Sequence, residues 1–212
     1  MQTVIALFSK TDTIVRPWLD AGYRAVLVDL QHPEGETTDG NLTRIGADML
    51  TWFPPRWLAL SDVAFAAAFP PCDHVAVSGA RWFKGKGLGK LAHSIQLFDR
   101  AAFWCEWFGA PYVIENPVST ISTYWRKPDH TFDPSDFTGF DLGDNYTKRT
   151  CLWTGNGFVM PAANRAADLP APDDRIHKAP PSAGRADFRS ATPPGFSRAV
   201  FNANHSHMQR AA

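Results

Sequence analysis

Short apolar runs separated by polar segments mark the first half of the chain. Four of these runs are rich in alanine, valine or isoleucine, as buried strands are, and they cover residues 3–8, 24–30, 62–69 and 112–115. Helices are predicted between them. Residues 13–23 favour a helix ending at Gly22, which Pro17 keeps short. Residues 89–108 carry apolar side chains at helical spacing and end at Gly109.

The order strand, helix, strand predicts an α/β fold with a mostly parallel sheet flanked by helices. Sheets of this kind bind ligands beyond the carboxyl ends of their strands. Asp29, Cys72 and Glu115 each fall at or just after such an end. We therefore expect these three side chains to meet at one edge of the sheet, which is the candidate site.

Residues 1–212 are predicted to form a single domain, because no repeat and no linker divides them. Residues 126–194 are rich in Asp, Gly and Pro and are expected to be loop-rich, with a late or edge strand over residues 148–155. A final helix over residues 195–204 is expected to close the chain.

The composition is that of a globular protein, with 44% apolar and 20% charged residues. No apolar run approaches the roughly 18 residues of a membrane span, and no signal peptide is recognised, so no membrane partner is expected. The three cysteines contain no Cys-x-x-Cys pair, which favours a reducing cytoplasm and no metal site. Lys and Arg total 21, as do Asp and Glu, so any surface that binds nucleic acid must be local.

Two short motifs lie at the ends of predicted strands. Pro70-Pro71-Cys72 comes after the third run, and Glu115-Asn116-Pro117 ends the fourth. Together with the opening LFS…AGY…VLVD, the KRT of KRTCLW and the closing ATPPGFSRAVFNAN, they resemble, in order, the motifs of DNA (cytosine-5)-methyltransferases. The resemblance covers most of the chain. It implies a Rossmann-like, S-adenosylmethionine-dependent fold of a minimal, phage-like kind that lacks a large target-recognition domain.

In that family a cysteine thiolate adds to carbon 6 of cytosine, and carbon 5 then takes the methyl group. The resemblance implies Cys72 as the nucleophile, which requires a thiol of lowered pKa. It implies that protonated Glu115 donates to ring nitrogen 3 and that Arg149 contacts the carbonyl at position 2. The residues alone leave alternatives open: Cys72 as a buried structural thiol, Glu115 as an ordinary strand-end acid, and Arg149 paired with a loop acid.

The resemblance also implies two sets of binding residues. The cofactor set comprises Phe8, Ser9, Lys10, Thr11, Asp29, Leu30, Asp48, Pro70 and Thr192. Within it, Asp29 has the usual position of an acid that binds ribose hydroxyls. The substrate set comprises Pro71, Ser78, Asn116, Pro117 and Lys148. Two other cysteines, Cys105 and Cys151, are interpreted as core residues. The tryptophans are interpreted as core or loop packing residues rather than as a platform on which bases stack: Trp82, Trp104, Trp107 and Trp125.

The first loop departs from the family, because residues 8–13 contain no glycine where the backbone should approach the cofactor. Two interpretations stay open. The chain is a catalytically silent nucleic-acid-binding protein, or Lys10 binds the extra carboxylate of carboxy-S-adenosylmethionine and a carboxymethyl group is transferred.

The segment between Trp153 and Thr192 is short where sequence-reading members carry a recognition domain. We therefore expect weak sequence selectivity. The expected partner is DNA, as an accessible single strand or a duplex with a flipped base, with a helper protein as a further partner. Free cytidine nucleotides are an alternative substrate. The resemblance implies a role in modifying a phage genome to evade restriction.

Overall fold

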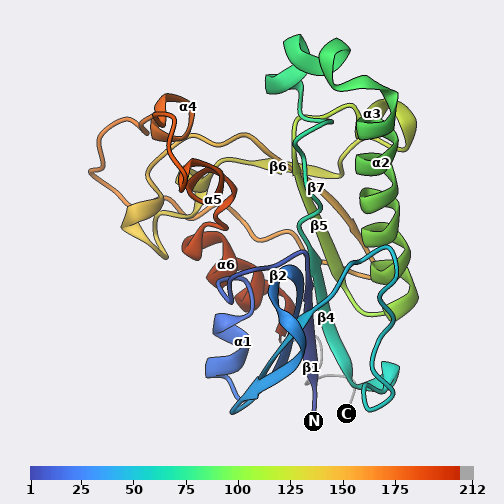
Figure 1. Cartoon of the computed structure of the whole chain (residues 1–212). Helices are drawn as coiled ribbons and strands as arrows, with labels where there is room; N and C mark the ends of the chain where they lie inside the picture. The colour runs from blue at the N-terminus through green and yellow to red at the C-terminus, as the bar shows by residue number, and fades with distance from the viewer. Residues whose placement is uncertain (206–212) are drawn as a thin grey trace.

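Seven strands form one sheet in the computed structural model, which describes residues 1–205 (Figure 1). Hydrogen-bonded neighbours follow the order β3-β2-β1-β4-β5-β7-β6. The strands are β1 Thr3–Leu7, β2 Arg24–Asp39, β3 Leu42–Gly46, β4 Val63–Ala68, β5 Tyr112–Pro117, β6 His130–Phe132 and β7 Thr150–Gly155. The final part of the predicted domain, residues 206–212, lies outside the described residues.

Helices cover both faces of the sheet. α2 (Phe83–Phe108) lies on one face, and α1 (Arg16–Asp20) and α6 (Pro194–Asn204) lie on the other (Figure 1). Each face has its own apolar core, with Trp104 from α2 in one and Trp18 from α1 in the other.

The remaining helical segments are short. They are α3 Ile121–Tyr124, α4 Arg175–Lys178, α5 Arg185–Ser190 and the 3-10 turns η1 Leu60–Asp62, η2 Val77–Trp82, η3 Pro134–Phe137 and η4 Leu142–Asp144. Within residues 1–205, no helix combines the length and apolar character that crossing a membrane requires.

The strand order confirms the predicted α/β architecture. β1 pairs in parallel with β2 and β4, β4 pairs in parallel with β5, and β7 runs antiparallel to both β5 and β6. The order β3-β2-β1-β4-β5 is that of a doubly wound sheet, in which ligands bind where the strand order reverses. The reversal lies between β1 and β4, so the ligand crevice is expected beyond Leu7 and Ala68. The sheet is compatible with a Rossmann-like fold.

Most predicted elements are confirmed with shifted ends. β1, β4, β5, β7 and α6 occupy the predicted spans. α1 begins at Arg16, because Pro17 fits the first turn of a helix, and its five residues make it short, as predicted. α2 begins earlier than predicted, and Gly87, with a φ of 77°, separates its first turn from the regular helix.

Residues 31–46 hold the largest feature that the sequence pattern did not predict. β2 continues beyond its buried half, and its second half folds back along the other side of β3, with Glu36 opposite Ile45 and Asp39 opposite Leu42. Exposed polar side chains fill this second half. No apolar alternation therefore marked it as a strand.

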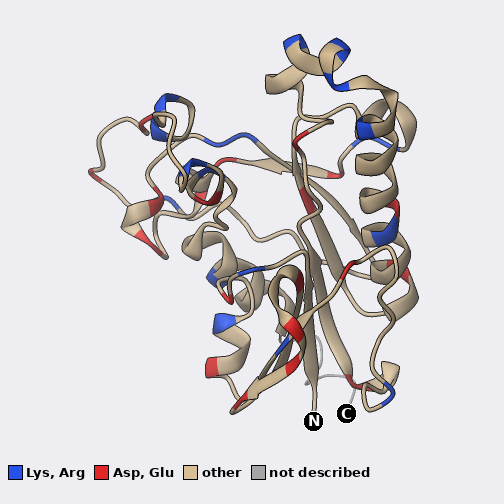
Figure 2. Ribbon diagram, viewed as in Figure 1, with Lys and Arg blue, Asp and Glu red and all other residues tan. Residues whose placement is uncertain are grey.

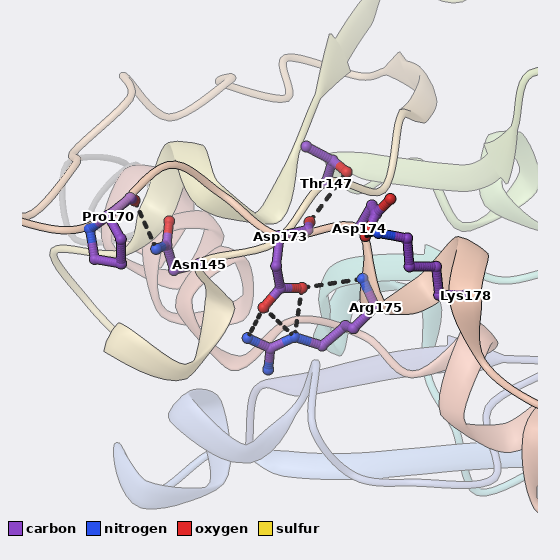
Figure 3. A network of polar contacts seen from close by, with 7 residues as sticks. All are labelled: Asn145, Thr147, Pro170, Asp173, Asp174, Arg175 and Lys178. Carbon is purple, nitrogen blue, oxygen red and sulfur yellow. Dashed lines mark hydrogen bonds and ion pairs between the residues drawn. The ribbon is translucent and has the colours of Figure 1, made fainter.

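The predicted loop-rich region, residues 126–194, is mostly irregular, but it contains β6, β7, α4 and α5. Polar contacts hold part of it in place (Figure 3). Asn145 Nδ2 donates to Pro170 O at 3.0 Å, and Thr147 N donates to Asp173 O at 2.8 Å. These contacts join the segment before β7 to residues 170–173.

The side chains interpreted as packing residues divide into two groups. Cys105, Cys151 and Trp104 are buried, as predicted. Trp82 is 61% exposed, Trp107 46% and Trp125 44%, so none of the three lies in the core. Two of them still pack against buried rings: the ring centroid of Trp107 lies 5.3 Å from that of Trp104, and that of Trp125 lies 5.7 Å from that of Phe98.

The start of α6 is held by a buried carboxylate. Gly195 N donates to Asp144 Oδ2 at 2.7 Å, and Asp144 is 3% exposed. Phe196 stacks on Phe132 of β6, with 4.0 Å between the ring centroids. The fit leaves no room for a side chain at Gly195, where an added Cβ would lie 2.6 Å from Phe137 O.

We expect Gly195→Ala to lower the free energy of unfolding by about 1–3 kcal/mol, because the new methyl group overpacks a closed site. Urea unfolding measures this change. Gly184→Ala is the matched control, since a Cβ there meets no atom within 4 Å. Equal losses in the two variants would contradict the prediction.

Asp144 should make stability depend on pH. Burial raises the pKa of its carboxyl to about 6, although the hydrogen bond from Gly195 opposes the shift. The folded chain therefore keeps a proton that the unfolded chain releases near pH 4, and the stabilisation present below that pH is lost as the pH rises through 6. Relative to Asp144→Asn, wild-type stability should fall by up to roughly 3 kcal/mol between pH 4 and 7. Urea unfolding across this range that gave a constant difference would contradict the assignment.

Candidate functional site

The loop after β4 places Cys72 at the carboxyl edge of the sheet. Phe69 N donates to Leu7 O at 3.0 Å, which keeps the chain beside β1 as it leaves β4. Val75 N and Ala76 N then donate to Cys72 O at 3.1 and 2.9 Å, closing a turn around the cysteine. The Cys72 side chain is half-buried and packs against the core on the α2 side.

β5 fixes this loop from the neighbouring strand. Asn116, which is 1% exposed, donates through Nδ2 to Pro70 O at 2.9 Å. Farther along, Val77 N donates to Val118 O at 2.9 Å, joining the turn after Cys72 to the segment after β5. Asn116 Oδ1 is buried and has no hydrogen-bond partner among the described residues. The position of Cys72 is therefore set by β5 as much as by β4.

Glu115 lies on the opposite side of β5 from Asn116. It lines a small hollow of about 10 Å³, which is enough for about one water molecule. The other lining residues are Phe69, Phe132, Lys148, Thr192, Pro193 and Phe196. Burial raises the pKa of the Glu115 carboxyl, and the charge of Lys148 opposes that shift. The neutral carboxylic acid is thus favoured relative to an exposed glutamate.

The electrostatic environment of Cys72 corrects one expectation. Burial, and after it the negative charges of Asp73 and Glu115, raise the pKa of the Cys72 thiol to about 11. Lys148 lowers it by less. The lowered pKa expected for a nucleophile is absent in this state, because the two carboxyl groups outweigh the single lysine. The same interactions place Cys72 within electrostatic reach of both Glu115 and Lys148.

The segment of residues 185–193 contacts the hollow and its surroundings, and Thr192 and Pro193 line the hollow itself. Lys10 Nζ, in the loop after β1, forms an ion pair with Asp187 of α5 at 2.8 Å. Lys148 Nζ donates to Ala191 O at 3.0 Å. At about 10 Å³ the hollow is much smaller than any ring-shaped ligand, so residues around it must rearrange before such a ligand can reach Glu115.

The first loop keeps its shape without glycine. Phe8 adopts a left-handed φ of 54°, which is uncommon for a residue with a side chain and is more frequent at functional sites. Ser9 N donates to Val28 O at 3.3 Å, and Ser9 Oγ donates to Thr11 O at 2.9 Å. Hydrogen bonds thus hold the loop in this conformation without a glycine.

The acids of the expected cofactor set lie along the same edge. Asp29 Oδ1 accepts from Gln31 N at 2.7 Å, and Asp48 Oδ1 accepts from Leu50 N at 2.9 Å. Leu30 is 69% exposed beside Asp29. Each carboxyl group uses one oxygen in a turn within the described residues. The ends of β1, β2 and β3 therefore contribute to one continuous edge with Cys72 and Glu115.

Not every predicted residue joins the hollow. Lys148 lines it, whereas Arg149 is exposed and forms no ion pair or side-chain hydrogen bond with any described residue. Ser78 is exposed on η2. Sequence reasoning missed Phe132 and Asp187, because their contacts with the site depend on chain segments distant in sequence. Within residues 1–205, no three His, Cys, Asp or Glu side chains gather as metal ligands would.

No protein-family model matches the chain, and no curated protein matches it. Function must therefore be argued from the geometry of this edge and from the chemistry of its residues.

The raised pKa of Cys72 predicts its reactivity. Alkylation of Cys72 by iodoacetamide should keep accelerating up to about pH 11, because the thiolate is the reacting form. Glu115→Gln removes a negative charge that raises the Cys72 pKa, so alkylation at pH 9 should become severalfold faster, and Lys148→Met should slow it.

Rates are measured by mass spectrometry of the modified peptide. Cys72→Ser provides the background from the buried Cys105 and Cys151. A reaction rate that levels off near pH 8.5 in the wild type would show that the thiol has an ordinary pKa.

Proposed function

We propose that the chain is a DNA cytosine-5 methyltransferase-like enzyme that transfers a methyl group from S-adenosylmethionine to carbon 5 of cytosine through a covalent Cys72 adduct. One observation carries the proposal. β5 holds the Cys72 loop through Asn116 and presents, from the adjacent position, a glutamate whose raised pKa favours its neutral form. The two groups lie at the edge where doubly wound sheets bind ligands.

The edge residues suit the proposed cofactor. Asp29 keeps one carboxylate oxygen outside its turn hydrogen bond, as binding of a ribose hydroxyl requires. Lys10 binds a carboxylate in this structure, that of Asp187, and would bind the carboxylate of an amino-acid moiety in the same way. These residues, with Phe8, Ser9 and Asp48, would hold S-adenosylmethionine. When bound, the cofactor supplies an electrophilic methyl group.

Cys72 makes the covalent contribution. Its thiolate adds to carbon 6 of the base, and the electron pair of the 5,6 double bond moves to carbon 5 and into the ring. Carbon 5 would use that pair to form a bond to the methyl carbon, while the bond between that carbon and the sulfonium sulfur breaks and its electron pair stays on sulfur. A base then takes the proton from carbon 5, the 5,6 double bond forms again, and the bond between Cys72 and carbon 6 breaks to release the thiolate.

Glu115 and Lys148 activate the ring in this proposal. Neutral Glu115 donates a hydrogen bond to ring nitrogen 3, and this hydrogen bond draws electrons away from carbon 6. Lys148, released from Ala191 O, would reach the carbonyl at position 2, the role that the sequence suggested for Arg149. Protonation of Glu115 when the base binds would also remove one of the negative charges that raise the pKa of Cys72. Base binding and thiol activation are therefore coupled.

A second candidate is a catalytically silent nucleic-acid-binding protein. The thiol pKa of about 11 and the 10 Å³ hollow favour it, because neither feature is that of an active site ready for its substrate. In the first proposal, both features belong to a resting state that residues 185–193 keep closed.

Trapping with 5-fluorocytosine separates the two. In 5-fluorocytosine, carbon 5 carries a fluorine atom in place of the proton whose removal releases the enzyme. A Cys72 adduct formed with fluorinated DNA and S-adenosylmethionine should therefore persist and shift the protein on a denaturing gel. Cys72→Ser should abolish the adduct. Cys151→Ala, which removes a buried thiol from β7, should retain it.

The remaining outcomes choose among the alternatives. An adduct with fluorinated cytidine nucleotide alone would indicate a free-nucleotide enzyme, and no adduct with either substrate would support the silent protein. On unmodified DNA, the mass gain of the product decides between methyl and carboxymethyl transfer.

A further inference from the structure

A segment whose charged residues are all Lys or Arg projects beside Cys72. Residues 74–98 contain four Lys or Arg residues and no Asp or Glu. Across the whole chain the two signs balance at 21 each, so this stretch is a local concentration of positive charge. We call residues 77–90, which comprise η2 and the start of α2, the basic arm.

The cations of the basic arm are available to a ligand. Arg81, Lys84 and Lys90 are exposed, and Lys86 Nζ donates to Asp73 O. Within residues 1–205, none of the four forms an ion pair with a carboxylate. The arm stands clear of the sheet at the top of Figure 1, and in Figure 2 it carries Lys and Arg but no acidic residue.

An exposed aromatic side chain lies among these cations. Trp82 is 61% exposed, and the Arg81 guanidinium lies 5.1 Å from the centroid of its ring. Leu88, also on the arm, is 83% exposed. Cations that track phosphates, combined with an aromatic face that stacks on bases, are the means by which proteins bind single-stranded nucleic acid.

The arm is connected directly to the nucleophile loop. The turn that closes on Cys72 O ends at Ala76, one residue before the arm begins. The arm ends just past Gly87, whose left-handed backbone separates the arm from the regular part of α2. A strand lying on the arm would therefore run toward the carboxyl edge that carries Cys72.

We propose that the basic arm binds single-stranded DNA, with Trp82 stacked on an unpaired base and with Lys84 and Lys90 at the flanking phosphates. In a duplex, the faces of the bases already stack on one another, so the lysines could bind it but the indole would gain little. Delivery of the strand to Cys72 rests on the proposed methyl transfer, whereas binding by the arm does not depend on it.

Fluorescence anisotropy with the full-length Cys72→Ser protein tests the proposal without catalysis. The probes are a labelled oligodeoxythymidine of about 12 nucleotides and a duplex of equal length. The single strand should bind more tightly. Trp82→Ala should weaken single-strand binding about tenfold and leave duplex binding nearly unchanged. Lys84→Ala should weaken both and lower the salt slope for the single strand by about 0.7.

Matched controls come from α2 and from α4. Trp107→Ala removes an exposed tryptophan at the far end of α2, and Lys178→Ala removes a lysine paired with Asp174; both should bind like the parent protein. Three results would overturn the proposal: tighter binding of the duplex, no loss in Trp82→Ala, or equal displacement of the strand by polyglutamate of matched charge.

The two proposals fail in distinguishable ways. Strand binding that depends on Trp82, without trapping of 5-fluorocytosine, would leave the arm assignment standing and remove the methyl transfer. If Trp82→Ala changed neither the trapping on DNA nor the binding of the single strand, the methyl transfer would stand and the arm assignment would fall.

Discussion

The buried hydrogen bond from Asn116 Nδ2 to Pro70 O joins the two strand ends on which the candidate site depends. Strand β5 alternates its side chains, so Asn116 reaches the Cys72 loop on one side while Glu115 enters the hollow on the other. The hydrogen bond thereby couples the position of a thiol on one loop to that of a carboxyl on the next strand. Because Asn116 is buried, replacing it would leave the Pro70 carbonyl without its side-chain partner in a site that water reaches poorly.

Local patterns were sufficient to predict much of the fold. β1 and β4 are short, fully buried runs, and α2 ends at Gly109 in the left-handed conformation that stops helices. The extension of β2 and its pairing with β3 were not predicted, because a polar strand at the edge of a sheet shows no alternation of apolar and polar residues. The edge position of Asp29, Cys72 and Glu115 followed from strand ends alone.

The electrostatics of the site could not be read from the sequence. Two residues of the expected set, Lys10 and Lys148, hold partners from the segment 185–193, and Lys10 and Asp187 are 177 positions apart in the chain. The thiol pKa depends on how far Cys72 is buried and on which carboxyl groups surround it. Such facts arise only once distant segments meet.

The irregular stretch between β7 and α6 starts and finishes at firmly held points. Gly155 ends β7 beside Tyr112, and α6 is fixed at its start by Asp144. The entropy of closing such a loop grows slowly, by about 0.6 kcal/mol for each doubling of its length. Extra chain could therefore be inserted here with little penalty to the sheet. The stretch between β7 and α6 is therefore a place where the scaffold could accept an additional folded module without rebuilding its core.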